Sequence, residues 1–195
     1  METKTRHTRS LLKEPAHPMI ELSFEFAQLK NLYRQGWLKR GIPKLRCESV
    51  ADHSFSVALL GYVIAEEHRR DLDSNRIMKM GLFHEIGEIY AGDITPSDGI
   101  NLEDKSAREY AAVQKVIPSP SFQKYLQVWK EFEDQKTPEA RFVGQIDRLE
   151  MALQANLYER IGFTGLDEFF PYVQERISSP ELKAIFDDLI RTRSL

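Results

Sequence analysis

Apolar residues recur every three to four positions along almost the whole chain, and no stretch alternates apolar and polar residues between turn signals. This spacing is typical of amphipathic helices and not of strands. The pattern therefore predicts an all-α fold. Because we find no internal repeat and no long linker, we expect one compact helical bundle forming a single domain.

Several of the expected helices carry clear start signals. In TPEA, Thr137 caps a helix and Pro138 takes its first position, and SSPE repeats this device at Ser179 and Pro180. Gly36, Gly92 and Gly162 are expected to close helices. We expect helices at residues 20–35, 49–68, 74–92, 105–117, 121–132 and 138–161, and a last one from residue 180.

Length and charge narrow the class of protein. With 195 residues, of which 42% are hydrophobic, the chain is long enough to bury a substantial core. A net charge of −3 gives no basic excess for gripping duplex nucleic acid, so a small substrate is favoured. No segment is long and apolar enough to span a membrane, and we expect no membrane association.

The single cysteine, Cys47, restricts the chemistry further. It excludes an internal disulfide framework and a thiolate-rich zinc site, so any metal here must be held by nitrogen and oxygen ligands. We expect a cytoplasmic protein. Residues 1–18 are polar and lack the apolar run of a signal peptide, so they are expected to form a flexible arm before a domain at 19–195.

Two histidines fall on helix faces that should point into the core. His53 shares its face with Val50 and Val57, and His84 lies on the inward side marked by Ile77 and Ile89. A lone inward histidine is more often a neutral core residue bonded to a carbonyl. Two inward histidines on neighbouring helices indicate that both belong to one functional site.

Carboxylates accompany these histidines. Glu85 adjoins His84 at about 100° around the helix, and Glu88 lies one turn further on. Asp147 borders the apolar stripe of the long helix, although it would serve equally well as a surface partner of Arg148 or Arg141.

Two imidazoles and two carboxylates from three helices suit a divalent transition metal such as manganese, cobalt, zinc, nickel or iron. Four protein ligands leave positions for water or a substrate phosphate, as in catalytic sites.

An ordered set of motifs now becomes informative: GWLKRGI, ESVADHSFSVALL, GLFHEIGEIYAGDITP, DKSAREYAAV and QIDRLEMALQANLYE. Together they resemble the HD-domain metal-dependent phosphohydrolases, in the branch of the 5′-deoxynucleotidases, over roughly residues 26–161. The resemblance implies a helical HD-domain bundle, a nucleotide substrate and a homodimer.

The resemblance also implies residue roles. It places His53, His84, Glu85 and Asp147 at the metal-ligand positions. Glu88 falls at the catalytic acid, and Asp93 at a second acid near the substrate. Trp37 and Arg40 would face the sugar and phosphate, with Arg46 or Lys44 as the alternative cation because the connector is longer than usual. Trp37 would equally well be a plug of the core at a helix end.

The main departure from the family is Glu85, where the resembling enzymes carry aspartate. One extra methylene moves the carboxylate by about 1.5 Å, which is large beside ligand distances near 2 Å. The expected outcomes are an active enzyme with a changed metal preference, a weak enzyme, or a degenerate binder. We favour the active enzyme because Glu88 and Asp93, which a binder would not need, are both present.

The sequence therefore predicts a phosphomonoesterase that acts on (deoxy)ribonucleoside 5′-monophosphates. The alternatives are an HD scaffold that binds a nucleotide without turnover, a phosphodiesterase and a guanosine tetraphosphate hydrolase. HEIGE also resembles the H-E-x-x-H zinc-protease motif, but Glu88 replaces the second histidine.

Aromatic residues are frequent in the second half of the chain. They would form a self-association surface or simply fill the core; the residues concerned are Phe122, Tyr125, Trp129, Phe169 and Phe170.

Overall fold

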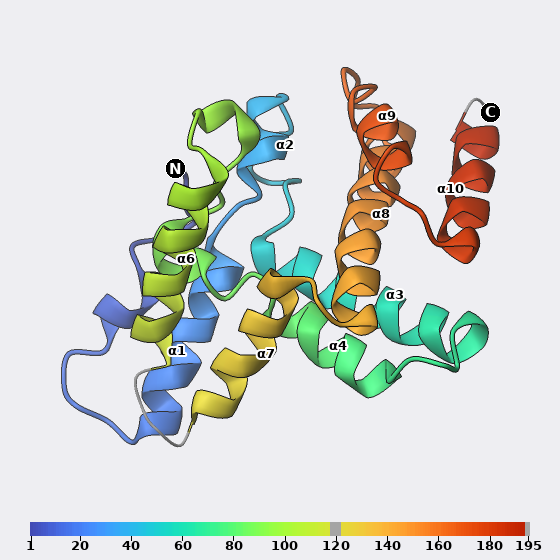
Figure 1. Ribbon diagram of the computed structural model, residues 1–195. Coiled ribbons are helices and arrows are strands. Elements are labelled where there is room, and N and C mark those ends of the chain that lie inside the picture. Colours follow the sequence, from blue (N-terminus) through green and yellow to red (C-terminus); the bar gives the residue numbers. More distant parts are fainter. Residues whose placement is uncertain (118–121, 194–195) are drawn as a thin grey trace. The chain divides into compact units, whose positions relative to one another are not determined.

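The fold was determined as a computed structural model, which describes residues 1–117 and 122–193 (Figure 1). Over these residues the regular elements are helices, and the only β-type pairings are isolated bridges from Thr3 to Leu32 and from Tyr33 to Ser49. The all-α prediction is therefore confirmed. The α-helices are α1 (Pro18–Asn31), α2 (Gln35–Lys39), α3 (Val50–His68), α4 (Ser74–Phe83), α5 (Glu88–Ala91), α6 (Leu102–Val116), α7 (Gln123–Asp134), α8 (Pro138–Arg160), α9 (Phe169–Gln174) and α10 (Pro180–Arg193), with short 3-10 helices η1 (Thr8–Leu11) and η2 (Pro96–Asp98).

The start signals read from the sequence are found at the helix ends. The Thr137 hydroxyl accepts a hydrogen bond from the backbone N–H of Ala140 at 3.2 Å, and Pro138 opens α8. At the start of α3, Ser49 and Asp52 bond each other's backbone N–H groups reciprocally, at 2.8 and 3.3 Å. These caps satisfy donors that a helix leaves unpaired in its first turn.

The helix expected at residues 20–35 ends four residues early, and Gly36, which was expected to close it, lies inside the next helix, α2. α1 ends at Asn31, and Leu32 takes an extended backbone conformation with φ −79° and ψ 125°. Leu32 and Tyr33 then pair with the backbone of Thr3 and Ser49. A new helix, α2, begins at Gln35. The apolar spacing continues through this break, which is why the sequence pattern did not reveal it.

The helix expected at residues 74–92 is also interrupted. α4 ends at Phe83, residues 84–87 form turns, and α5 begins at Glu88. In this region Ile86 and Glu88 donate to carbonyls three residues earlier, at 3.2 and 3.0 Å, instead of four. The prediction that His84, Glu85 and Glu88 share one continuous helix is therefore wrong.

The remaining boundaries differ only slightly from those expected. α6 begins at Leu102, three residues earlier than predicted, because the side chain of Asn101 caps it by accepting from Asp104 N at 2.8 Å. The start expected at Ser121 lies outside the described residues, and α7 runs from Gln123.

The chain divides into two compact units. Unit 1 comprises residues 1–54 and 83–130, and it contains α1, α2, α5 and α6. Its core joins residues far apart in sequence: Leu22, Leu29, Leu32, Val50, Ile86, Ile89, Val113, Val116, Ile117 and Trp129. Burial of these side chains is the main force that holds the short helices of this unit in place.

Unit 2 comprises residues 55–82 and 131–195, and its longest helix is α8. α8 is flanked by α9 and α10, and its apolar stripe is fully buried at Phe142, Ile146 and Leu149. α3 and α4 approach each other closely in this unit at Gly81 and Ala58. The approach leaves no room for a side chain at Gly81, since a Cβ there would lie 2.6 Å from the Cα of Ala58. The stripe read from the sequence is therefore a core stripe.

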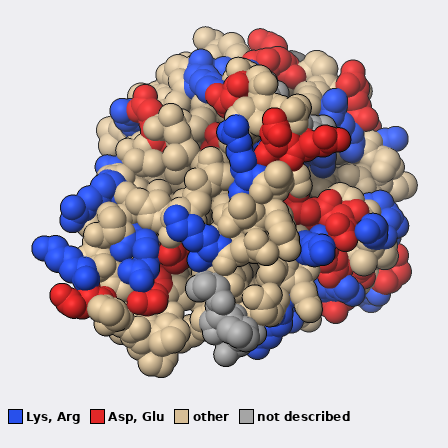
Figure 2. Space-filling model, turned by 60° about the vertical axis from the view of Figure 1, so that its left-hand side comes forward, with Lys and Arg blue, Asp and Glu red and all other residues tan. Residues whose placement is uncertain are grey.

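The exterior carries both signs of charge. On the face drawn in Figure 2, basic and acidic side chains are interspersed, in keeping with the net charge of −3. Among the described residues, no helix has both the length and the apolar character needed to cross a membrane.

Candidate metal centre

His53 and His84 meet inside unit 1. His53 lies in the first turn of α3 and His84 in the turn after α4, and both are buried. Their Nε2 atoms face each other at 3.3 Å, with the rings tilted by 58°. The two imidazoles that the sequence directed inward are therefore brought together.

Glu85 completes a three-residue cluster. Its Oε1 lies 3.6 Å from Nε2 of His84 and 3.8 Å from Nε2 of His53. Donor atoms held about 2.1 Å from one ion lie roughly 3 to 3.5 Å apart, so the three atoms have nearly the spacing that one ion requires. Two imidazole nitrogens and one carboxylate are also a donor set that suits divalent transition metals. The residues present fit a metal.

The charge of Glu85 is balanced by Arg34. The Arg34 guanidinium lies 3.3 Å from Oε1 of Glu85 and 3.4 Å from Oδ1 of Asp93. Burial acts to raise the pKa of Glu85, but His84, Arg34 and His53 outweigh it, and the pKa lies below its ordinary value. Glu85 is therefore held in the ionised form that binds metal.

Glu88 has the opposite character. It is 2% exposed, and its Oε2 has no hydrogen-bond partner among the described residues. Burial, followed by the repulsion of Glu85 and Asp93, raises the pKa of Glu88 well above its ordinary value. Adjacent carboxylates whose pKa values are pushed apart are typical of sites that use one acid for charge and another for proton transfer.

Asp93 is fixed by backbone and side-chain donors. Its Oδ2 accepts a short hydrogen bond from the backbone N–H of Gln35, the first residue of α2. Gly92 precedes it with φ +84°, a conformation that favours glycine, and this residue ends α5 and turns the chain. The result is a carboxylate aimed at Arg34 on the same side as Glu85 and Glu88.

Lys105 of α6 adds a second cation. It is half-buried and pairs with Glu109 at 3.3 Å. Burial acts to lower the pKa of Lys105, but Glu85, Glu109 and Glu88 raise it on balance. α6 can come this close because Gly87 has no side chain: a Cβ there would lie 2.9 Å from the Cβ of Glu109.

Neither Arg34 nor Lys105 was singled out from the sequence. Both lie in segments that were noted for other reasons, Arg34 just before GW and Lys105 in DKSAREY. The sequence signal that could have identified them was the presence of a basic residue within or next to a family motif. Their role depends on α1, α2 and α6 folding against the turn at residues 84–87, which local periodicity does not reveal.

The substrate residues expected in the connector are arranged differently. Trp37 is 3% exposed and its indole N–H donates to Glu48 at 2.6 Å, as expected for a core plug. Arg40 donates to the carbonyl of Gly36 at 3.4 Å, and Arg46 is exposed. Lys44 pairs with Glu2. Contact of Trp37, Arg40 or Arg46 with a nucleotide stays a prediction.

Asp147 lies half-buried on α8, in unit 2. The arginines considered as its surface partners bond carbonyl oxygens: Arg141 donates to Lys136 O at 2.7 Å, and Arg148 donates to Gly144 O. The role of Asp147 as a fourth ligand stays a prediction.

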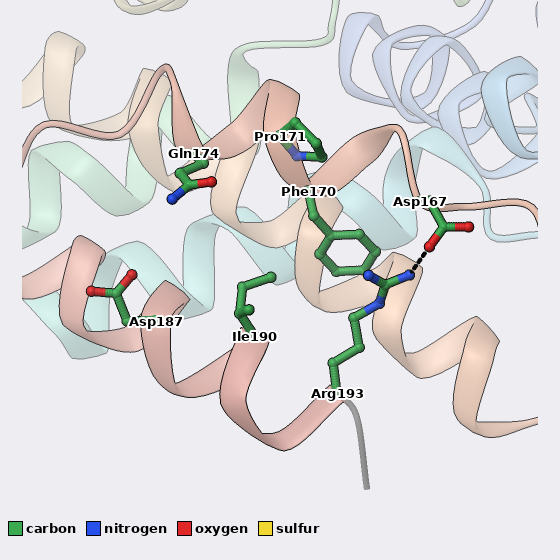
Figure 3. Close-up of a pocket in the computed structure, with 7 residues that line it drawn as sticks. All are labelled: Asp167, Phe170, Pro171, Gln174, Asp187, Ile190 and Arg193. Atoms are coloured by element: carbon green, nitrogen blue, oxygen red, sulfur yellow. Dashed lines mark hydrogen bonds and ion pairs between the residues drawn. The ribbon is translucent and has the colours of Figure 1, made fainter.

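A separate surface pocket of about 420 Å³ lies between α9 and α10 in unit 2 (Figure 3). It contains none of the expected site residues. The guanidinium of Arg193 lies 3.9 Å from the ring centre of Phe170 and pairs with Glu159 and Asp167.

The chain belongs to the HD-domain family, whose model matches residues 26–183. The 5′-deoxynucleotidase HDDC2 of Homo sapiens is 33% identical over 184 residues, which covers 92% of this chain and 88% of the human protein. The 5′-deoxynucleotidase YGK1 of Saccharomyces cerevisiae is 30% identical over 199 residues, covering 96% and 89%. The resemblance inferred from the motifs is confirmed.

Solved structures agree with this assignment. A conserved hypothetical protein from Pyrococcus furiosus matches with a TM-score of 0.74 and 30% identity, covering 88% of this chain and 99% of its own. A protein from Magnetospirillum magnetotacticum, described as a predicted metal-dependent phosphohydrolase, matches with a TM-score of 0.68 and 26% identity, covering 91% of both chains. The HD-domain bundle expected from the sequence is confirmed.

Proposed function

We propose that this protein is a metal-dependent phosphohydrolase that releases phosphate from (deoxy)ribonucleoside 5′-monophosphates. The observation that carries the proposal is the cluster of His53, His84 and Glu85 beside the buried, unpaired carboxylate of Glu88. The relatives named 5′-deoxynucleotidases match most of the chain, which supports the same activity here.

The metal would be held by His53, His84 and Glu85, with Asp147 proposed as the fourth ligand. When bound, a divalent ion supplies a Lewis acid that polarises the phosphoryl group and lowers the pKa of a water molecule. Manganese, cobalt, zinc, nickel and iron all suit the mixed nitrogen and oxygen donors, and the donor set does not choose among them.

Arg34 and Lys105 would neutralise the phosphate dianion. The carboxyl groups of Glu85, Glu88 and Asp93 would by themselves repel an anion. Arg34, just before α2, and Lys105, in α6, place positive charge beside these groups. A guanidinium matches phosphate oxygens in pairs, which favours Arg34 for orientation, whereas an ammonium acts as a point charge. We add these two residues to the proposed substrate contacts Trp37, Arg40 and Arg46.

Glu88 would move the proton. Hydrolysis adds water across the bond between phosphorus and O5′: water oxygen joins phosphorus, the P–O5′ bond breaks, and O5′ leaves with a proton. A carboxyl group whose pKa is raised above its ordinary value can hold the proton taken from the water and deliver it to the leaving oxygen. Asp93 is held in place by Arg34 and by the N–H of Gln35. Its negative charge would help to keep the pKa of Glu88 raised.

The test is phosphate release by purified protein, stripped of metal and reloaded with manganese, cobalt or zinc, from a panel of nucleoside monophosphates. Glu88→Gln should lower kcat by about 10²- to 10⁴-fold, the usual contribution of a general acid or base. Glu175→Gln, at an exposed glutamate of unit 2, is the matched control and should leave kcat unchanged.

Two outcomes would contradict the proposal. Equal release by the wild type and Glu88→Gln would remove Glu88 from the mechanism. No release with any metal or nucleotide would favour the alternative of an HD scaffold that binds a nucleotide without turnover.

We further propose a cytoplasmic homodimer. Of the aromatic residues first considered for self-association, Trp129 and Phe170 are only 2% and 3% exposed, and Phe122 and Tyr125 pack against the core of unit 1. A better surface is the outer face of α3, where Phe55, Leu59 and Val63 follow one another at four-residue spacing and are 61%, 51% and 48% exposed. Such an apolar stripe favours association.

A further inference from the structure

The first eight residues of the chain are tied to unit 1 along their length. Near α1, Lys4 N donates to Asn31 O at 2.8 Å, and the Asn31 side chain bonds both the N–H and the carbonyl of Thr5, at 2.5 and 2.9 Å. Further on, Thr8 N donates to the Gln28 side chain at 3.0 Å. Asn31 and Gln28 are 4% and 2% exposed, so these contacts lie in buried surroundings.

The segment also contacts α5, the helix that leads to Asp93. Nε2 of His7 lies 3.1 Å from the carbonyl oxygen of Ile89, and the His7 ring stacks on Tyr90 at 4.7 Å. At the other end of the segment, the Met1 side chain fills the space over Gly92, where an added Cβ would clash with the methionine sulfur. The segment thus contacts α5 at Ile89 and Tyr90 and also contacts Gly92, the residue immediately before Asp93.

Gln35 links this segment to the site. Its side-chain oxygen accepts from Glu2 N at 2.8 Å, and its side-chain nitrogen donates to Glu2 O at 2.9 Å and to Tyr33 O at 2.8 Å. The same residue donates its backbone N–H to the carboxylate of Asp93. One buried glutamine therefore holds residue 2 with its amide and Asp93 with its main chain.

We propose that residues 1–8 are a brace that positions Asp93, acting through the amide of Gln35 and the contact of Met1 with Gly92. Asp93 opens a connector, and α5 before it is only four residues long, so local structure alone holds it weakly. Site residues work only when supporting contacts fix them within about 0.5 Å of the productive geometry. Gln35 is thus a positioning residue, and its effect on turnover rests on the proposed function.

The test replaces Gln35 with methionine, which keeps the volume and removes the amide bonds to Glu2. Gln145→Met is the control, because it is the same substitution at a glutamine whose side chain accepts hydrogen bonds from the backbone N–H groups of Ser178 and Ser179 in unit 2 and not from residues 1–8. Amide hydrogen exchange of residues 92–95 is measured on the metal-free proteins. Kcat and KM for a deoxynucleoside monophosphate are measured on proteins reloaded with manganese.

Gln35→Met should speed exchange at residues 92–95 and lower kcat, each by about tenfold, the size expected for one or two lost neutral hydrogen bonds. Gln145→Met should change neither the exchange at residues 92–95 nor kcat. Unchanged exchange in Gln35→Met, or equal acceleration in both variants, would overturn the brace. If the wild type releases no phosphate, the proposed function fails, while the exchange result still decides the brace.

Discussion

The Glu85 carboxylate reaches both imidazoles, although its side chain is one methylene longer than the aspartate of the resembling enzymes. α4 ends at Phe83, so Glu85 projects from a turn and not from a helix whose geometry would fix its direction. Its Oε1 lies 3.6 and 3.8 Å from the histidine nitrogens. The backbone thus accommodates the longer side chain, which favours an intact ligand set over a degenerate binder.

Glu85→Ala should lower the affinity for manganese by at least about tenfold, because changes around a metal site typically cost 10- to 100-fold in affinity. Isothermal titration calorimetry on chelated protein gives the Kd directly. Glu175→Ala serves as the control with an unchanged Kd. A Kd for Glu85→Ala equal to that of the wild type would show that Glu85 is not a ligand.

The apolar periodicity of the sequence identified those site residues whose side-chain direction is set by their position on a helix face. His53 and His84 were placed inward by the period of their apolar neighbours, and the structure brings their rings together. Arg34, Lys105 and the backbone of Gln35 were not found. Arg34 and Gln35 contribute through contacts with residues 51 to 59 positions away, and Lys105 acts on Glu85, which lies 20 positions away. Apolar spacing carries no information about those contacts.

At the scale of elements, helix ends marked by a cap were predictable and helix breaks inside an apolar run were not. Thr137 and Pro138 identified α8 because a capping hydroxyl and an N-terminal proline act locally. The turn at residues 84–87 was missed because Ile86 and Ile89, both 1% exposed, continue the helical apolar spacing through it. That break sets the direction of Glu85 and Glu88.

The close approach of α3 and α4 leads to a stability prediction. Gly81→Ala should lower the free energy of unfolding by about 1–3 kcal/mol, because its Cβ would fall 2.6 Å from backbone atoms of Ala58 that cannot move aside. Gly36→Ala in α2 meets no atom closer than 4.0 Å, so it should be neutral or stabilise by about 0.4–1 kcal/mol. Denaturant melts compare the two; a Gly81→Ala protein as stable as Gly36→Ala would contradict the packing.

An ion pair between Lys39 of α2 and Asp98 joins α2 to the segment after Asp93, and its contribution to stability depends on pH. Lys39 lies 2.8 Å from Asp98, and this lysine, with the donors of Thr95, lowers the pKa of Asp98 to about 2. Because the folded pKa lies below the unfolded value of 3.8, the unfolded chain binds more protons between these values. The stabilisation is complete above pH 4 and is lost as the pH falls towards 2.

The difference in melting temperature between the wild type and Asp98→Asn should therefore be constant above pH 4 and shrink towards zero near pH 2. Lys39→Met, which removes the cation, should weaken this pH dependence. Thermal melts at several pH values give the curve. A difference that stays constant between pH 4 and pH 2 would contradict the lowered pKa.

At the scale of the whole molecule, the HD-domain model runs through both compact units, from residue 26 to residue 183. The class of fold was readable from the sequence because helical periodicity and the order of the motifs are spread along the chain. The division into units was not, because it joins residues 1–54 to 83–130 across the intervening helices.

The proposed homodimer predicts that Leu59→Glu yields a monomer, because a charge at the centre of the α3 stripe would be buried against its own copy. Leu45→Glu is the matched control at a leucine that is 93% exposed in the connector before α3, and it should leave the mass unchanged. Light scattering at two concentrations measures both. A wild-type protein that is monomeric at both concentrations would rule out the dimer.

Unit 1 is proposed to hold a divalent ion between His53, His84 and Glu85. The most direct measurement is anomalous diffraction from a crystal soaked with manganese and a deoxynucleoside monophosphate. We predict one strong peak within about 2.3 Å of both imidazole Nε2 atoms and a Glu85 oxygen, with the phosphate beside Arg34. A manganese peak elsewhere, or no peak between the two histidines, would contradict the account.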